Sequence, residues 1–428
     1  MTVIQNSSAL GQSDLRKDAL SIAEAAYAAI DAENVIRRKI RVEDGQLHIV
    51  DRAYPLTGRN VYFVGIGKCA VRAGLLLEQL LGGSLTAGIM LDVSAGTYSD
   101  ASKLELYVGT HPLPSEANAR ASARVLEFLS GRSESDLVIM LISGGGSALL
   151  SLPEMPMTSI DESDLFKKLT GSGAPIQELN TVRKHISKAR GGALAVAAYP
   201  AEVVSLAVSD VPGDDLASIA SGPTIRDTST VADAKAALAK YGIDTSRVTF
   251  LETEKDEKYF ARVSNSLLLA SRDALSAMLG EALARGYAAR IADTRFSGEA
   301  GVIGRSISAT LHESPSKSAL LYAGESTVTL GASPGKGGRN QEMALATLEE
   351  VRSGELILPF ASDGHDNTDH AGAISDELSR THAAEKSLDI REHLEAHDSY
   401  LFFTGTSDAL VTGLMPSNVA DLVIALKA

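Results

Sequence analysis

Apolar positions recur along the chain with two periods, one typical of helices and one typical of buried strands. Residues 14–33 repeat apolar side chains every three or four positions, which predicts an amphipathic helix. Beyond it, short apolar runs alternate with amphipathic stretches. We predict strands at residues 61–64, 88–93, 104–108, 136–142, 202–208, 288–292, 319–323, 326–330 and 356–361. We predict further helices at residues 69–81, 115–129, 175–188, 231–240, 272–284, 299–311 and 340–351. This alternation predicts an α/β fold with mainly parallel sheets and helices on both faces.

One stretch of the chain breaks this alternation. Residues 245–265 are polar and charged, and they have no clear periodicity. A chain of 428 residues is long enough for about two domains. We therefore predict an N-terminal α/β domain over residues 1–255 and a C-terminal α/β domain over residues 256–428.

Charge and cysteine content narrow the classes of function. The formal net charge of −14 argues against nucleic acid as the main partner, because a phosphate backbone requires clustered Lys and Arg. Cys69 is the only cysteine, so an internal disulfide cannot form and a cytoplasmic location is expected. No apolar run approaches the roughly 18–20 residues that span a bilayer, so we expect no membrane partner.

The first candidate site is the turn after the strand predicted at residues 61–64. Gly65, Gly67 and Ala70 nearly match the dinucleotide-binding pattern, in which glycines let a pyrophosphate approach the start of a helix. Lys68 lies inside this turn and is equally suited to hold a substrate anion. The residues alone therefore leave three interpretations open: a nicotinamide site, a phosphate site and a simple tight turn.

A second candidate site is the sequence SGGGS, which follows the strand predicted at residues 136–142. Consecutive glycines free backbone N–H groups at the start of a helix, and such groups bind phosphate. A tight turn of small residues is the alternative. A nucleophilic serine is less well supported, because the second glycine of the nucleophile elbow is absent. We predict a phosphate site formed by Ser143, Gly144, Gly145, Gly146 and Ser147.

Carboxylates cluster after the strand predicted at residues 202–208. Asp210 follows this strand directly and is a candidate for a general base or for a Mg²⁺ ligand. Asp214 is a second candidate Mg²⁺ ligand, with helix capping as its alternative. Asp215 fits a helix cap better than a metal site.

The sequence GASPGKGGRNQEMAL, residues 331–345, resembles a nucleotide-binding P-loop but fails in two respects. Its glycine spacing is one residue short, and Gly337 replaces the Ser or Thr that would bind Mg²⁺. We therefore reject a P-loop. Arg339 remains a candidate for binding a carboxylate or phosphate through two parallel hydrogen bonds, and a solvated surface arginine is the alternative.

Two more segments carry candidate ligands. Residues 362–377 combine several carboxylates with two histidines, but their spacing fits neither an EF-hand nor a zinc site. Turn chemistry, or Mg²⁺ shared with nucleotide phosphates, explains this segment better, and Asp363 is its candidate ligand. Lys184 begins a basic segment that is either a ligand site or a solvated helix end.

Taken together, these motifs resemble the glycerate 2-kinase family, whose members combine an N-terminal α/β domain with a C-terminal MOFRL domain. The resemblance covers nearly the whole chain and follows the order of the family's motifs. It rests on GIGKCA (65–70), THPLPSEAN (110–118), SGGGSALL (143–150), LNTVRKHISKARGG (179–192), SDVPGDDLASIASGPT (209–224), GGRNQEMAL (337–345) and SDGHDNTDHAGA (362–373).

The resemblance implies two Rossmann-like domains with an active-site cleft between them. It implies transfer of a phosphoryl group from ATP, with Mg²⁺, to the 2-hydroxyl of D-glycerate, which gives 2-phosphoglycerate. The family's key lysine and arginine match Lys68 and Arg339, and the nucleotide phosphates would lie near Ser143–Ser147, with Lys184 and Asp363 as further nucleotide ligands. We expect Arg339 to bind the glycerate carboxylate and Lys68 to lie between substrate and γ-phosphate. The implied partners are a small acid and a nucleotide, and a homodimer is one assembly that the sequence permits.

Some features of the sequence keep other functions open. The segment TGLMPSNVADL, residues 412–422, departs from the family's pattern, so another small hydroxy acid or sugar acid is an alternative substrate. An NAD(P)-dependent hydroxypyruvate reductase would account for the glycine turn and for Asp92, an acidic residue at the end of the next strand. A non-catalytic sensor of nucleotides or sugar acids is the third alternative.

Overall fold

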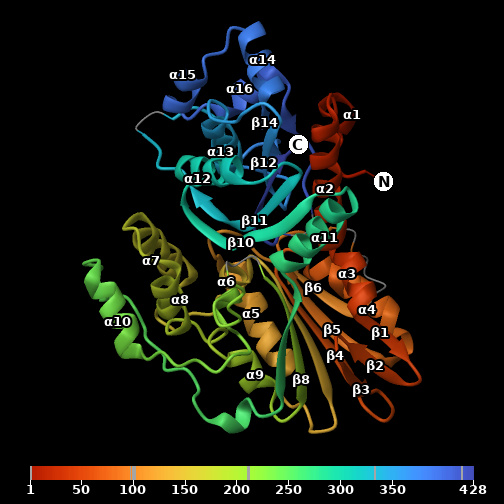
Figure 1. Cartoon of the computed structure of the whole chain (residues 1–428). Coiled ribbons are helices and arrows are strands. Elements are labelled where there is room, and N and C mark those ends of the chain that lie inside the picture. Colours follow the sequence, from red (N-terminus) through yellow and green to blue (C-terminus); the bar gives the residue numbers. More distant parts are fainter. Residues whose placement is uncertain (1, 97, 99–102, 210–212, 332–333, 416–417) are drawn as a thin grey trace. The chain divides into compact units, whose positions relative to one another are not determined.

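The computed structural model describes the chain except for residues 1, 97, 99–102, 210–212, 332–333 and 416–417 (Figure 1). It divides into two compact units. We call Val35–Leu269 the continuous unit, and Met1–Asn34 together with Ala270–Ala428 the split unit. These units differ from the predicted domains in two ways. The predicted boundary after residue 255 precedes the last strand of the continuous unit, and the first 34 residues pack with the C-terminal part of the chain.

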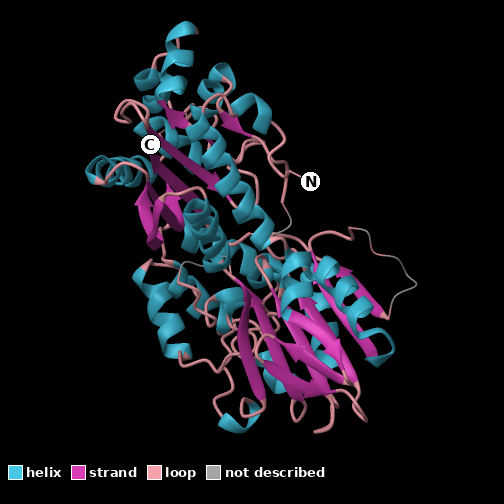
Figure 2. Cartoon of the chain, turned by 45° about the vertical axis from the view of Figure 1, so that its right-hand side comes forward, coloured by secondary structure: helices cyan, strands magenta, loops and turns pink. Residues whose placement is uncertain are grey.

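A six-stranded parallel sheet forms the centre of the continuous unit (Figure 2). Its strands in spatial order are β6 (Leu104–Val108), β5 (Leu85–Asp92), β4 (Val61–Ile66), β7 (Leu137–Ile142), β8 (Glu202–Val208) and β9 (Val263–Leu269). In chain order, this sheet begins with β4 and continues outward through β5 to β6. The chain then returns to β7, which lies beside β4, and continues in the opposite direction through β8 to β9. The α/β fold and the parallel pairing predicted from the apolar runs are confirmed for this unit. In such doubly wound sheets, ligands bind at the carboxyl ends of the strands where the winding reverses, here β4 and β7.

Helices cover both faces of this sheet because successive strand residues point to opposite sides. α4 (Ala70–Leu81) packs on the face that carries Phe63 and Met90. α5 (Glu116–Leu129) and α9 (Ala193–Ala198) pack on the other face, against Val64 and Leu91. The other elements that lie wholly or mostly in this unit are α3 (Ala32–Lys39), β1 (Ile40–Glu43), β2 (Gln46–Ile49), β3 (Arg52–Pro55), η1 (Gly82–Ser84), α6 (Gly146–Leu149), α7 (Ser159–Gly171), α8 (Ile176–Lys184), η2 (Ile219–Ser221), α10 (Val231–Lys240) and η3 (Glu257–Tyr259).

Three of these helices form an apolar cluster of their own. Leu165 of α7, Val182 of α8 and Leu238 of α10 are all buried in this cluster. The cluster holds one face of α8, so the opposite face of this helix is free to carry polar side chains.

The split unit contains a seven-stranded mixed sheet, and here the expectation of a mainly parallel sheet is wrong. β10 and β11 pair in parallel, while the other described neighbours pair antiparallel. The reason is that β16, the last strand of the chain, inserts between β11 and β12 and runs antiparallel to both. Along the sheet lie β10 (Ala288–Glu299), β11 (Ser318–Thr327), β16 (Asp421–Lys427), β12 (Glu355–Ala361), β13 (Gly372–Ala373) and β15 (Ala409–Leu410), with β14 (Ser375–Asp376) beside β12.

Long-range contacts explain why the N-terminal helix belongs to the split unit. α2 (Asp14–Ile30) and α11 (Ser271–Ala284) pack together against the sheet. Arg16 of α2 is fully buried and forms ion pairs with Asp376 (2.6 Å) and Asp408 (2.8 Å). The unit's remaining helices are α1 (Ser7–Leu10), α12 (Ala300–Glu313), α13 (Arg339–Thr347), α14 (Glu377–Glu385), α15 (Ile390–Glu395) and α16 (Ser399–Thr406). No helix among the described residues has both the length and the apolar character needed to cross a membrane.

Candidate functional site

The turn after β4 and the glycine loop after β7 are bonded to each other at the carboxyl edge of the parallel sheet. The backbone N–H of Ser143 donates to the carbonyl oxygen of Ile66 over 2.8 Å, and that of Lys68 donates to Gly144 over 3.0 Å. Ile66 and Ser143 are 77 residues apart in the sequence, so two distant segments form one structure here. The predicted Lys68 turn and the predicted phosphate loop are brought together at the position where the winding of the sheet reverses.

The geometry of this turn does not suit a dinucleotide. Gly67 has a φ of +118°, and a Cβ built on it would lie only 2.1 Å from Ser143 Oγ. The missing side chain therefore makes room for Ser143 rather than for a pyrophosphate. Asp92 is buried, and its carboxylate accepts hydrogen bonds from the backbone N–H of Val71 (3.0 Å) and of Val93 (2.6 Å). The two features that suggested a nicotinamide cofactor thus have local structural roles.

The glycine loop leaves backbone donors available for an anion. Gly145 has a φ of +86°, a left-handed conformation that favours glycine. Among the described residues, the N–H groups of Gly144, Gly145 and Ser147 have no hydrogen-bond partner. The Ser147 hydroxyl lies 3.1 Å from that of Ser221, which fixes the end of the loop. Free N–H groups in a turn of this kind suit phosphate oxygens.

The side chains of Lys68 and His111 approach this loop from other segments of the chain. A Cβ built on Gly145 would lie 3.4 Å from Lys68 Cγ and 3.3 Å from His111 Cδ2, so both side chains pass close to the loop. Burial, together with the positive charges of Lys68 and Arg183, lowers the pKa of His111, which is therefore neutral at pH 7. His111 lies in the segment THPLPSEAN (110–118) but was not among the site residues predicted from the sequence.

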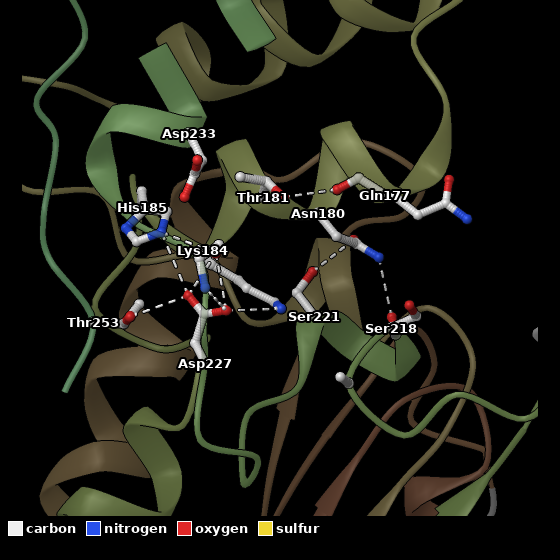
Figure 3. A network of polar contacts seen from close by, with 12 residues as sticks. Gln177, Asn180, Thr181, Lys184, His185, Ser218, Ser221, Asp227, Asp233 and Thr253 are labelled. Atoms are coloured by element: carbon white, nitrogen blue, oxygen red, sulfur yellow. Dashed lines mark hydrogen bonds and ion pairs between the residues drawn. The ribbon is translucent and has the colours of Figure 1, made fainter. Parts of the chain in front are cut away.

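The helix α8 is tied to the glycine loop through Asn180 (Figure 3). Ser221 donates to Asn180 Oδ1 over 3.0 Å, and Asn180 Nδ2 donates to the carbonyl oxygen of Ser218 over 3.2 Å. Since Ser221 also contacts Ser147, a chain of polar contacts runs from α8 to the loop. This chain fixes the orientation of α8 relative to the candidate phosphate site.

The predicted ligand Lys184 lies one turn further along α8 and has a carboxylate partner within the protein. Its ammonium donates to Asp227 Oδ1 over 3.2 Å (Figure 3). Asp227 is almost fully buried and also accepts hydrogen bonds from Ser229 and Thr253. His185 lies 3.4 Å from the same carboxylate. This network anchors the end of α8.

In the split unit, Arg339 is the first residue of α13 and is paired with two carboxylates. Its Nη1 lies 2.5 Å from Glu325 Oε1, and its Nε lies 2.5 Å from Asp421 Oδ2. Burial raises the pKa of Asp421 to about 7, with Arg339 opposing this rise and Asp366 adding to it. Arg339 borders a cavity of about 300 Å³. The cavity is also lined by Ser326, Thr327, Val328, Leu330, Gly335, Gly337, Gly338, Glu342, Asn367 and His397.

The acidic segment after β12 orients α13. Asp366 is buried, and its carboxylate accepts hydrogen bonds from the backbone N–H of Asn340 (3.0 Å) and of Gln341 (2.7 Å). This carboxylate caps the N-terminus of α13 and thereby positions Arg339. Asp363, the predicted nucleotide ligand, is partly buried and accepts from the N–H of His365 over 3.1 Å within the same turn. Turn chemistry was predicted for this segment, whereas the capping role of Asp366 was not.

Of the two predicted metal ligands, the structure describes only Asp214. Asp210 lies outside the described residues. Asp214 is partly buried, with a φ of +56°. Asp215 accepts hydrogen bonds from Ala217 N (3.1 Å) and Ser218 Oγ (2.6 Å), so it closes the turn before η2. The cap predicted for Asp215 is not observed, because Ser218 is the N-cap residue of η2 and no side chain caps this short helix. The part of the chain that the structure describes contains no group of three or more His, Cys, Asp or Glu that could hold a metal ion.

Comparisons with known proteins cover nearly the whole chain. Two family models match it, a domain of unknown function (DUF4147) over residues 18–251 and the MOFRL family over residues 318–421. The chain is 33% identical to the glycerate 2-kinase of Pyrococcus horikoshii, over 96% of this chain and 97% of that protein. It is 35% identical to a putative hydroxypyruvate reductase of Agrobacterium vitis, over 92% and 94%. The crystal structure of a glycerate kinase from Thermotoga maritima matches with a TM-score of 0.85 and 31% identity, over 96% of this chain and 99% of that one.

Proposed function

We propose that this chain, which belongs to the glycerate 2-kinase family, transfers the γ-phosphoryl group of ATP to the 2-hydroxyl of D-glycerate. A bond forms between the 2-oxygen and the γ-phosphorus, the bond from that phosphorus to ADP breaks, and the hydroxyl proton leaves. The products are 2-phosphoglycerate and ADP. The observation that carries this proposal is the docking of the Lys68 turn onto the glycine loop at the reversal point of the parallel sheet. A cytoplasmic location and a homodimeric assembly are further predictions.

The proposal assigns the phosphate groups to the continuous unit. Phosphoryl transfer depends mainly on positioning and on stabilising negative charge in the transition state. We propose that the free N–H groups of the Ser143–Ser147 loop hold nucleotide phosphate oxygens, and that Lys68 binds the γ-phosphoryl group during transfer. The bond between Lys68 N and Gly144 supports this assignment, because it keeps the lysine beside the loop. For Lys184, a nucleotide role requires that its ammonium bind phosphate in addition to Asp227.

The proposal assigns the acid substrate to Arg339 in the split unit. Arg339 is the predicted ligand for the carboxylate of D-glycerate, and the neighbouring cavity of about 300 Å³ is large enough for a small acid. Two protein carboxylates already accept from this guanidinium. Asp421 is buried, whereas the Glu325 side chain is 47% exposed, so Glu325 is the partner that a substrate carboxylate would displace. Asp363 remains a predicted nucleotide ligand.

The described residues do not form a dedicated magnesium cage. Proteins usually bind Mg²⁺ in nucleotide sites through one or two carboxylates together with phosphates and water, so Asp214 and Asp210 stay predicted ligands of a nucleotide-bound ion. When bound there, Mg²⁺ would neutralise phosphate charge. Asp210 is also the predicted general base for the 2-hydroxyl.

One experiment tests the reaction and its alternatives together. The protein is incubated with ATP, Mg²⁺ and D-glycerate, and the product is identified by ³¹P and ¹³C NMR. We expect 2-phosphoglycerate and a matching amount of ADP. Formation of 3-phosphoglycerate would contradict the regiochemistry, and faster turnover of a four-carbon sugar acid would contradict the substrate. Consumption of NADH with hydroxypyruvate, without any phosphorylated product, would replace the kinase by the reductase.

A further inference from the structure

Two arginines lie beside the glycine loop, and they differ in their partners. Arg190 is fully buried and lies 2.5 Å from the carboxylate of Glu162. It also donates to the carbonyl oxygens of Ser147 (2.7 Å) and Arg183 (3.3 Å), so it joins the loop to the end of α8. Glu162 therefore compensates the charge of Arg190, and the hydrogen bonds of Arg190 connect segments of the protein.

Arg183 forms no ion pair with a carboxylate among the described residues. Its guanidinium stacks on the Phe166 ring, with 3.9 Å between Cζ and the ring centroid. Among the described residues, no carboxylate pairs with it and its side-chain N–H groups donate no hydrogen bond. Burial and the charge of Arg190 lower the pKa of Arg183 to about 9, although the charge of Glu162 opposes this fall, so the group is still protonated at neutral pH. A partly buried cation is thus held in place by stacking while its hydrogen-bond donors remain unused.

The surroundings of Arg183 point to the ligand that would use these donors. Arg183, Ser147 and Glu162 border the same cavity of about 10 Å³, which places Arg183 close to the end of the loop but is too small to hold a phosphate itself. The charges of Arg183 and Lys68 both act on His111, which lies beside Gly145. Cationic side chains from two separate elements therefore surround a loop that has free N–H groups of its own. A stacked guanidinium presents its N–H groups in one plane, a geometry that suits two oxygens of one anion.

We propose that Arg183 binds a phosphate group held at the Ser143–Ser147 loop. The site would take the phosphates of a nucleotide rather than the carboxylate of the acid substrate. A phosphate oxyanion offers three acceptor oxygens and up to two negative charges, which match the several donors and two cations gathered here. Neutral His111 borders the site and contributes at most one further donor. The identity of the phosphate as that of ATP or ADP rests on the proposed function, whereas anion binding by Arg183 does not.

Calorimetric titration of the full chain tests this site, with inorganic phosphate, ADP and D-glycerate as separate ligands. The main variant is Arg183→Met, which retains an unbranched side chain over Phe166 but removes the charge and the donors. We expect its affinity for ADP and for phosphate to fall about 10- to 100-fold, since hydrogen bonds to charged groups have this strength. Its affinity for D-glycerate should stay within about twofold. The melting temperature without ligand should not fall, because the charge removed is an uncompensated one.

Two further variants complete the test. Arg226→Met makes the same change at an exposed arginine of the same unit that pairs with Glu257, and it should bind every ligand as the wild type does. Arg183→Lys keeps the charge without the planar donors, so it should lose part of the ADP affinity, and it replaces the methionine variant if that variant does not fold. Wild-type ADP affinity in Arg183→Met, or in Arg183→Lys if only that variant folds, would overturn the proposal. A loss confined to D-glycerate would overturn the choice of phosphate.

This inference and the proposed function fail in different ways. If the wild type produces no phosphoglycerate but Arg183→Met still loses affinity for ADP, the reaction is wrong and the phosphate site stands. If the wild type produces 2-phosphoglycerate and Arg183→Met binds ADP normally, the reaction stands and Arg183 has no part in phosphate binding.

Discussion

Arg339 in the split unit and Arg183 in the continuous unit are both partly buried, but they differ in their ion pairs. Arg339 lies between Glu325 and Asp421, whereas Arg183 stacks on Phe166 and meets no carboxylate among the described residues. Removing a charge from water is costly unless a partner compensates for it. The comparison shows that a compensated arginine binds an anionic ligand only by exchanging partners, while an uncompensated one gains its first partner from the ligand.

The largest effect is expected at Lys68, the residue that links the glycine loop to the proposed reaction. Lys68→Ala should lower kcat/KM by about 10²- to 10³-fold, mainly through kcat, because a transition-state charge loses its partner. Arg339→Ala should instead act mainly on the KM for D-glycerate. Steady-state kinetics of the folded variants measure both parameters. Lys258→Ala, at an exposed lysine paired with Asp256, is the matched control and should keep wild-type rates. Equal kcat in Lys68→Ala and the wild type would remove Lys68 from the reaction.

The next largest effect is expected when the compensated neighbour of Arg183 loses its partner. Glu162→Gln leaves Arg190 as a buried cation without a carboxylate, and both side chains of this pair are almost fully buried. We expect the free energy of unfolding to fall by about 3 kcal/mol, measured by urea denaturation.

A second substitution sharpens this prediction. The double variant Glu162→Gln/Arg183→Met should recover part of the lost stability, because the remaining arginine no longer faces a second positive charge. A double-mutant cycle measures this coupling directly. Strict additivity of the two changes would mean that Arg183 and Arg190 do not repel each other, and the contrast between them would lose its electrostatic basis.

A smaller effect, and one that depends on pH, is expected at Asp421. Its pKa in the folded protein is raised from 3.8 to about 7, so the folded state holds this proton more tightly than the unfolded chain does. The contribution of Asp421 to stability is therefore full below pH 4 and is lost as the pH rises through 7. Relative to the wild type, Asp421→Asn should become more stable with rising pH, by about 1.4 kcal/mol per pH unit at most over that interval.

Urea denaturation at several pH values measures this difference. Val423→Ala is the control, because Val423 is a buried apolar residue of the same strand and cannot titrate. Its stability deficit should be the same at every pH. A pH-independent difference for Asp421→Asn would show that the carboxyl is ionised throughout and fully compensated by Arg339.

The smallest effect is expected at Glu325, the exposed partner of Arg339. Glu325→Gln removes a carboxylate that competes with the substrate, so the KM for D-glycerate should fall about two- to fivefold, in line with an exposed ion pair worth about 1 kcal/mol or less. The affinity for ADP should not change. Glu313→Gln, at an exposed glutamate that ends α12, is the control. A higher KM in Glu325→Gln would mean that this carboxylate positions Arg339 rather than competing with the substrate.

Sequence alone predicted the strands of the continuous unit well, and for a clear reason. β4, β7 and β8 are buried on both faces, so each appears as an uninterrupted apolar run that ends at a polar or glycine-rich turn. β9 was missed because it is an edge strand whose first five residues are only partly buried and include three polar ones, and its first three residues were assigned to the linker at residues 245–265. β16 was missed as well, although it is apolar, and its insertion is what makes the second sheet mixed.

The candidate site shows the same division. From residue types and their order, the sequence predicted that Lys68, the SGGGS loop and Arg339 carry the chemistry, because glycines after a strand and isolated cations are local features. Only the tertiary structure decided which cations are compensated. Glu325 and Asp421 reach Arg339 from 14 and 82 residues away, and Asp366 caps its helix from 26 residues away. Arg183, in contrast, meets a phenyl ring. The charge state of a site depends on such distant partners, and no local pattern in the chain encodes them.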